Sequence, residues 1–189
     1  MKDSIMTLTQ AALPSRTFLT NAILVLAGTA LLAMSAQVSV PMYPVPMTLQ
    51  TLAVSLIGLA YGSRLGAVTV IAYLAEGAMG LPVFANFASL PAFTGPTAGF
   101  LFGFVGMAWL TGFMVERGFD RGFVKLFVAA ILPALLLFVP GVTVLKLVTG
   151  LGWEAAFFAG CAPFLIGALV KAIVAAMAVK GGWNLIDRR

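Results

Sequence analysis

Six apolar segments, each almost free of charge, make up most of the sequence. They run over about residues 18–38, 48–62, 65–80, 97–115, 123–139 and 164–179. Charged residues are only 9% of the chain, whereas a soluble globular domain carries roughly 25%. So few charges cannot cover a water-facing surface, and long apolar runs are typical of membrane-spanning helices. The pattern predicts an all-α integral membrane protein, with one domain over residues 1–189 and six transmembrane helices.

Basic residues fall mainly in alternate connections between these segments. The connections and tails of one set carry Lys2, Arg16, Arg64, Arg117, Arg121, Lys125, Lys180, Arg188 and Arg189. In the other set Lys146 is the only basic residue, and Glu154 offsets its charge. Because positive residues are enriched on the cytoplasmic side, both termini are predicted to face the cytoplasm. The connections predicted to face outward are 39–47, 81–96 and 140–163.

Composition also narrows the chemistry. The net charge of +5 is explained by membrane orientation, so nucleic acid is not an expected partner. The chain has no histidine and one cysteine, Cys161, and it has neither a catalytic motif nor a phosphate-binding GxxxxGK loop. We therefore expect no metal, no cofactor and no enzymatic activity, and an ATP-driven function would need a separate subunit. A small intramembrane enzyme or a purely structural helical protein would share this composition, but an enzyme needs a poised nucleophile or acid–base pair.

Two ionisable residues lie inside the apolar segments, where a charge is costly. Glu76 lies in AYLAEGAMG and Lys171 in GALVKAIVAA. Structural alternatives exist for both, because either side chain can reach water near a helix end, and the two can pair. The functional interpretation is that both point into a ligand cavity that opens outward. There an ammonium group would donate to a carboxylate or carbonyl, and a carboxylate would accept N–H groups.

The outward connection over residues 81–96 is uncharged but rich in aromatic and polar side chains. Pro82 ends the preceding helix, and Gly95-Pro96-Thr97 predicts a helix start with free N–H groups. Irregular backbone at membrane depth survives only where it is packed in protein or lines a cavity. The connection is therefore predicted to form one wall of a small-molecule site. Its further candidate ligand contacts are Phe84, Asn86, Phe87 and Phe93.

The first outward connection, residues 39–47, reads SVPMYPVPM and holds three prolines. Proline fixes φ and blocks a helix start, so this segment is predicted to be extended and stiff. It is either a passive connector or a lid over the pocket. Tyr43 within it, and Gln50 at the outer end of the second apolar segment, are candidate ligand contacts.

Five motifs, in this order, resemble one family. They are VPMYPVPMTLQTLAV, YGSRLGAVTVIAYL, EGAMGLPVFANF, GPTAGFLFGF and PFLIGALVKAIVAA. The set is similar to BioY, the biotin-specific membrane subunit (S component) of energy-coupling factor (ECF) transporters. The resemblance implies the six-helix S-component fold in a multi-pass protein of the bacterial cytoplasmic membrane. It also implies that biotin is bound from the outer side and transported.

The resemblance extends to partners. S components associate with a transmembrane coupling protein and a pair of ATPases, although some family members are reported to work without the ATPase module. The sequence leaves open whether this chain works with these subunits, alone, or as a homo-oligomer. An S component for another anionic vitamin is also open, but a ligand without an acid group would leave Lys171 unexplained.

The residues that match family positions are Asn86, Gly95, Thr97, Phe100 and Lys171. The resemblance implies that Asn86 binds the ureido or carboxylate end of biotin and that Phe100 lies on the ring. Two departures from the family pattern stand out. The family often has an aspartate one turn before the lysine, where this chain has Ala168, and Glu76 is a candidate to replace it. The family's GPTGGY reads GPTAGF here, so Phe100 lacks a hydroxyl.

Overall fold

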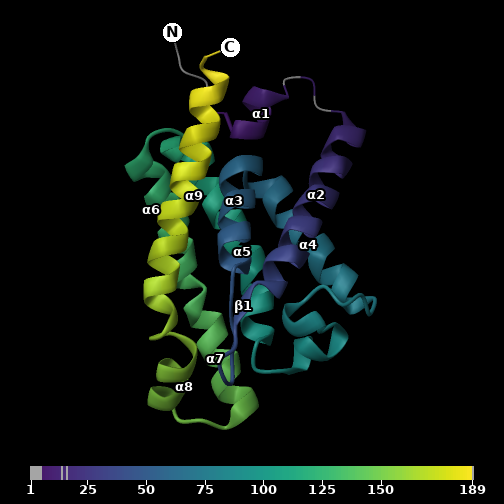
Figure 1. Cartoon of the computed structure of the whole chain (residues 1–189), viewed down its shortest axis with the longest axis vertical. Helices are drawn as coiled ribbons and strands as arrows, with labels where there is room; N and C mark the ends of the chain where they lie inside the picture. The colour runs from purple at the N-terminus through teal and green to yellow at the C-terminus, as the bar shows by residue number, and fades with distance from the viewer. Residues whose placement is uncertain (1–5, 14, 16, 189) are drawn as a thin grey trace.

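The computed structural model describes residues 6–13, 15 and 17–188, and it is mostly helical (Figure 1). The elements, in chain order, are α1 (Leu8–Ala12), α2 (Phe18–Gln37), β1 (Ser39–Val40), β2 (Met47–Thr48), α3 (Gln50–Tyr61), α4 (Ser63–Ala78), η1 (Ala85–Phe87), η2 (Leu90–Thr94), α5 (Ala98–Met114), η3 (Val115–Phe119), α6 (Phe123–Leu136), α7 (Phe138–Thr149), α8 (Trp153–Gly160) and α9 (Phe164–Ile186). Each of the six apolar segments contains a helix, which confirms the expectation of a helical protein.

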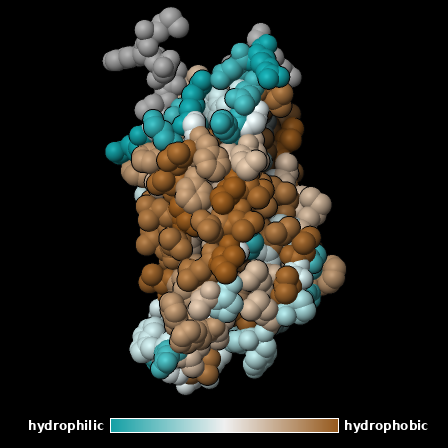
Figure 2. All heavy atoms as spheres, turned by 60° about the vertical axis from the view of Figure 1, so that its left-hand side comes forward, coloured by the Kyte–Doolittle hydropathy of each residue, from teal (hydrophilic) through white to brown (hydrophobic). Residues whose placement is uncertain are grey.

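Four helical stretches within the described residues are long and apolar enough to cross a membrane. They are Phe18–Gln37, Ala98–Phe119, Phe123–Thr149 and Trp153–Ile186. The helices α3 and α4 have 12 and 16 residues and meet at Gly62, whose φ of 86° turns the chain between them. Figure 2 shows a hydrophobic band across one face of the molecule, with hydrophilic residues at the end where α1 lies. This surface is the one a bilayer would cover.

The connection over residues 39–47 was expected to be extended, and its two ends are, because Ser39 pairs with Thr48 and Val40 with Met47 in a short antiparallel hairpin. The expectation for the chain after residue 139 was wrong. That stretch is not a simple connection, because α7 and α8 occupy most of it. Pro140 lies in the first turn of α7, where its missing N–H costs no intrahelical hydrogen bond. Gly150, in the left-handed conformation at φ 72°, ends α7.

The helix α5 lies at the centre of the bundle, and small residues let its neighbours approach closely. Gly58 of α3 faces the backbone of Ala108 and the side chain of Thr111 on α5. Gly99 of α5 faces the Pro140 carbonyl oxygen of α7. A side chain at either glycine would overlap these atoms. The packing fixes α3, α5 and α7 relative to one another, and each of these helices contributes residues to the cavity described below.

The ends of several elements meet near α1, which we call the α1 end of the molecule. Thr9 Oγ1 donates to the Ala60 carbonyl oxygen (2.8 Å), and Leu8 packs against Gly182 of α9. Arg121 pairs with Asp187 at 3.3 Å, and its guanidinium lies 4.3 Å from the Trp183 ring centre. The first described helix and the end of α9 therefore lie together. The charges at Lys2, Arg16 and Arg189 lie outside the described residues.

The start of α4 is capped by Glu116, a residue that no sequence pattern singled out. Its carboxylate accepts from the Ser63 backbone N–H (2.8 Å) and from the Ser63 hydroxyl (2.7 Å). A carboxylate at a helix N-terminus satisfies free N–H groups and complements the helix dipole. This contact ties the α3–α4 junction to the end of α5.

We expect Glu116→Ala to lower the unfolding free energy by about 1 kcal/mol, the typical cost of a lost helix cap. The unfolding midpoint in detergent should fall by about 2–4 °C for a chain of this size. Ligand binding should not change, because Glu116 does not line the cavity. Asp120→Ala is the matched control, since the structure records no hydrogen bond to that nearby carboxylate. A midpoint equal to that of the wild type would contradict the capping role.

Candidate functional site

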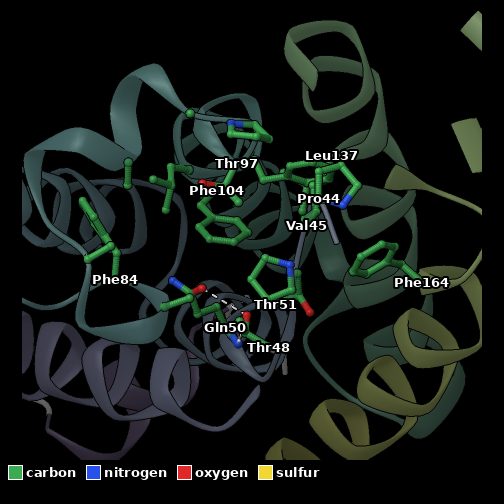
Figure 3. Close-up of a pocket in the computed structure, with 18 of the residues that line it drawn as sticks. Pro44, Val45, Thr48, Gln50, Thr51, Phe84, Thr97, Phe104, Leu137 and Phe164 are labelled. Atoms are coloured by element: carbon green, nitrogen blue, oxygen red, sulfur yellow. Dashed lines mark hydrogen bonds between the residues drawn. The ribbon is translucent and has the colours of Figure 1, made fainter. Parts of the chain in front are cut away.

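A cavity of about 390 Å³ lies at the opposite end of the bundle from α1. Four regions of the chain wall it: the hairpin with the start of α3, the segment 84–97 with the start of α5, the α6–α7 junction, and the start of α9 (Figure 3). Most of the lining is apolar. The polar side chains on its wall are Thr48, Gln50, Thr51, Asn86, Thr97 and Lys171.

Lys171 is the only charged residue that lines this cavity, among the residues the structure describes. Its Nζ donates to the Thr48 carbonyl oxygen (2.6 Å) and to Thr51 Oγ1 (3.2 Å). An ammonium group has three donors, so one remains for a ligand. The two fixed bonds hold the ammonium at the wall where α9 meets α3. The site therefore offers one positive charge in an apolar surrounding.

Glu76 does not join this site. It lies on α4, is partly exposed, is not among the lining residues and has no recorded ion pair with Lys171. The expectation that it replaces the missing aspartate is therefore not supported by the geometry. Ala168, at that aspartate's position, lines the cavity one turn before Lys171 and is buried. The lysine thus has no carboxylate beside it in the cavity.

The hairpin covers one side of the cavity. Pro44, Val45 and Pro46, which lie between β1 and β2, are lining residues, and the strand pairing at Ser39–Thr48 fixes the base of this loop. Tyr43 was expected among the ligand contacts, but its side chain is 96% exposed and it is not a lining residue. The prolines, and not the tyrosine, form the cavity face of the loop.

A chain of hydrogen bonds runs under the cavity through Gln50. The Thr48 hydroxyl donates to Gln50 Oε1 (3.0 Å), and Gln50 Nε2 donates to the Tyr73 hydroxyl (2.9 Å). Tyr73 in turn donates to the Val83 carbonyl oxygen (2.8 Å). Gln50 and Tyr73 are both buried, so these bonds form away from water, where they are strong. The chain connects the Lys171 region to the segment 84–97.

We expect Tyr73→Phe to weaken ligand binding by about fivefold to tenfold. The substitution keeps the ring but leaves Gln50 Nε2 and the Val83 carbonyl oxygen without their recorded partner, at a cost of about 1–3 kcal/mol shared between stability and binding. Titration of the purified protein with ligand measures the effect. Tyr61→Phe is the control, since that hydroxyl makes no recorded hydrogen bond and lies away from the cavity. Equal losses in the two variants would show that the hydrogen-bond chain has no special role.

The aromatic residues of the segment 84–97 divide into three kinds of environment. Phe84 is 2% exposed and lines the cavity, and its ring makes edge contacts with Tyr73 (5.2 Å between centroids) and Phe93 (5.3 Å). Phe93 packs between Phe84 and Phe102 and does not line the cavity. Phe87 is 69% exposed and does not line it either. Phe87 and Phe93 were predicted ligand contacts, and the structure places neither of them at the cavity wall. The aromatic pattern alone does not reveal which rings face inward.

Asn86 lines the cavity from the short turn η1, where its φ of 57° and ψ of 34° are left-handed. Asparagine tolerates this conformation better than most residues. Its side chain offers both a donor and an acceptor. Asparagine at this position therefore suits both the left-handed turn and contact with a polar ligand group.

The helix α5 starts at the cavity. Gly95, Thr97 and Phe100, which were predicted to contact a ligand, are lining residues of the cavity. The free N–H groups expected after Pro96 are partly used inside the turn, because Ala98 N donates to Gly95 O (3.1 Å) and Phe100 N to Thr97 O (3.0 Å). This helix start is therefore a weaker anion site than the sequence suggested. Phe100 packs edge-on against Phe138.

Several lining residues carried no sequence signal. Thr48 and Thr51 belong to the VPMTLQT motif but have no charge or ring. Leu137, Phe138 and Phe164 are apolar residues in apolar helices, so nothing in the sequence distinguishes them from core or lipid-facing positions. The break between α6 and α7 places the first two at the cavity.

Comparisons with known proteins agree on one family. The sequence profile of the BioY family matches residues 5–188. The chain is 38% identical over 163 residues to the "Biotin transporter BioY" of Rhizobium etli, covering 80% of this chain and 87% of the relative. It is 36% identical over 150 residues to the "Biotin transporter BioY" of Thermotoga maritima, covering 79% and 87%.

The fold is similar to a solved structure. The crystal structure of the S-component for biotin from an ECF-type ABC transporter matches with a TM-score of 0.78 and 20% identity, over 88% of this chain and 93% of that chain. The relatives are named as transporters, which agrees with the expectation that the chain is not an enzyme. The profile match covers nearly the whole chain, and both of the relatives named above exceed 30% identity over most of their own length. The chain belongs to the BioY family.

Proposed function

We propose that this chain captures biotin for uptake, as the substrate-binding membrane subunit of an ECF-type vitamin transporter. The observation that carries the proposal is the cavity of about 390 Å³ with one cation, Lys171, in a mostly apolar wall. Biotin has one carboxylate, a ureido group with two N–H donors and a carbonyl, and an apolar thioether ring. Lys171 supplies a charged donor, and the Asn86 and Gln50 amides supply donors and acceptors. Phe84, Phe100 and Phe104 supply apolar surface.

The proposed topology has six spans, with both termini cytoplasmic in the bacterial inner membrane. The apolar helices and the hydrophobic band in Figure 2 support this placement. Arg64 in α4, Arg117 in η3, and Arg121 and Arg188 just beyond η3 and α9 lie at the α1 end, and positive residues favour the cytoplasmic side. The cavity at the other end then opens outward. In this arrangement α3 and α4 are the two short spans, joined at Gly62.

ATP hydrolysis is assigned to separate partner subunits, together with a transmembrane coupling protein. The chain has no phosphate-binding loop of its own. The S-component named in the structural match belongs to an ECF-type ABC transporter, which supports partners of this kind. The presence of neighbouring genes for a coupling protein and an ATPase would support this assembly, and a homo-oligomer is its alternative.

Calorimetric titration of the purified protein in detergent tests the proposed ligand. We expect biotin to bind at one molecule per chain. Pantothenate and lipoate, which are also carboxylic acids with apolar parts, should not compete at equal concentration. Folded protein that takes up no heat with biotin, or that prefers one of the other acids, would overturn the proposal.

A further inference from the structure

Gln37, the last residue of α2, lies outside the cavity and outside the motifs of the site. Its Nε2 donates to the Phe84 carbonyl oxygen (2.9 Å), and its Oε1 accepts from the Phe87 backbone N–H (3.2 Å). Nε2 also lies 3.4 Å from the Ala33 carbonyl oxygen on its own helix. One amide therefore bridges both ends of η1, the turn that carries Asn86.

The backbone of this turn needs support from its surroundings. Asn86 and Phe87 both have φ of 57°, in the left-handed region. Asparagine adopts this conformation readily, but a bulky residue such as phenylalanine does so rarely. Such conformations persist only where neighbouring structure holds them, and they are concentrated at functional sites. Within the turn, Phe84 N donates to Ala88 O (3.0 Å) and Ala88 N donates to Ala85 O (3.2 Å), but neither bond involves the backbone of Asn86 or Phe87.

The recorded hydrogen bonds from other elements to the backbone of residues 83–88 come from two side chains. Tyr73 reaches Val83, before the turn, and Gln37 reaches Phe84 and Phe87, on either side of Asn86. The amide of Gln37 is suited to this position because it presents a donor and an acceptor at once. A carboxylate or an ammonium group would satisfy only one of the two backbone partners.

We infer that Gln37 is a positioning residue for the ligand site, which holds the turn at residues 84–88 so that Asn86 faces the cavity and bound ligand escapes slowly. This inference rests on the proposed function, because the ligand is biotin. Gln37 does not line the cavity, so it acts on the ligand through Asn86. The effect therefore falls mainly on dissociation, since the turn is part of the wall that ligand must pass.

The test measures the dissociation rate of radiolabelled biotin from purified wild type and Gln37→Met. Methionine keeps the length of the side chain but removes both backbone hydrogen bonds. We expect dissociation to be about tenfold faster, as two hydrogen bonds of ordinary strength would give, with little change in association. Met34→Ala, on an exposed position one turn earlier in α2, should leave the rate unchanged. Unchanged dissociation from Gln37→Met would overturn the inference.

A double-mutant comparison separates positioning from a general loss of stability. If Gln37 acts through Asn86, Gln37→Met should add almost nothing in an Asn86→Ala background. Independent, additive effects would overturn the inference. Gln37→Glu keeps only the acceptor for the Phe87 N–H, so it should accelerate biotin dissociation less than Gln37→Met does. If Gln37→Met does not fold, Gln37→Glu serves as the test variant. If the wild type binds no biotin, the proposed function itself is wrong. If the wild type binds biotin and the Gln37 variants release it at the wild-type rate, only the role of Gln37 is wrong.

Discussion

Lys171→Met is expected to bind biotin at least about 30-fold more weakly than the wild type. Methionine has a similar length and apolar stem, so the substitution removes the charge and the donors but little packing. Removing one partner of a buried, hydrogen-bonded charge costs roughly 2–5 kcal/mol, and each 1.4 kcal/mol is about tenfold in affinity. No other charged side chain lines the described cavity to compensate. Calorimetric titration, or displacement of radiolabelled biotin, measures the loss.

Lys180→Met is the matched control for this experiment, because Lys180 is an exposed lysine on the same helix, α9, towards the α1 end. It should bind biotin with wild-type affinity. Lys171→Arg tests geometry, since a guanidinium keeps the charge but cannot fit the bonds to Thr48 and Thr51 in the same way. Wild-type affinity in Lys171→Met would exclude Lys171 from ligand binding while leaving the family assignment intact.

The same variant identifies which end of biotin the ammonium group holds. Lys171 can donate to the carboxylate or to the ureido carbonyl, and both are acceptors. The affinities of biotin and biotin amide for wild type and Lys171→Met form a cycle. If the ammonium group contacts the carboxylate, the loss of affinity from Lys171→Met and the loss from replacing the carboxylate by an amide should be non-additive. Additive losses would assign Lys171 to the ureido end.

Much of the helical architecture could be predicted from hydrophobicity alone. Long apolar runs are a strong signal, and each of the six contained a helix. The stretch after residue 139 was mispredicted because Pro140-Gly141 has the composition of a turn. Proline in the first turn of a helix is nevertheless tolerated, and α7 uses it there. The two-residue hairpin was missed because strands this short show no alternation of polar and apolar residues.

The site was less predictable, for a physical reason. In a soluble protein an apolar residue indicates the core, but in a membrane protein apolar residues face the core, the lipid and the ligand alike. Leu137 and Phe164 therefore gave no signal. Polar residues were more informative, and Lys171, Asn86 and Gln50 all line the cavity. Glu76 shows the limit of that rule, since it lies on α4 but the buried face of that helix presents Tyr73 instead.

The supporting contacts around the site were also beyond sequence reasoning. The bonds of Gln37 to Phe84 and Phe87 join residues about 50 positions apart, and those of Lys171 to Thr48 and Thr51 join residues more than 100 apart. Nothing local to either residue specifies such a partner. These contacts follow from the packing of helices, which cannot be worked out from the local patterns of one sequence.

Phe84→Ala is expected to displace the part of the cavity wall that the segment 84–97 forms. The Phe84 ring fills a space between Tyr73, Phe93 and the backbone of Gly77, where an added Cβ on Gly77 would overlap the ring. Removing a buried phenylalanine typically costs about 3–5 kcal/mol. We expect the loss to divide between a lower unfolding midpoint and biotin affinity weakened by at least about tenfold, because the adjacent turn carries Asn86. Titration and thermal unfolding of the same sample separate the two effects.

Two further variants, Phe102→Ala and Gly77→Val, test whether the effect depends on the position of the Phe84 ring or on aromatic packing in general. Phe102 contacts Phe93 on the other side of the cluster but is 56% exposed, so its truncation should change biotin affinity little. Gly77→Val leaves Phe84 in the chain but closes the space that its ring occupies, so it should reproduce the binding defect. Agreement between Phe84→Ala and Gly77→Val would show that affinity depends on where the ring is seated, and not only on the apolar surface that it offers to the ligand. Wild-type binding in Gly77→Val would mean that the wall re-forms without this seat, and the effect of Phe84→Ala would then be assigned to lost contact with biotin.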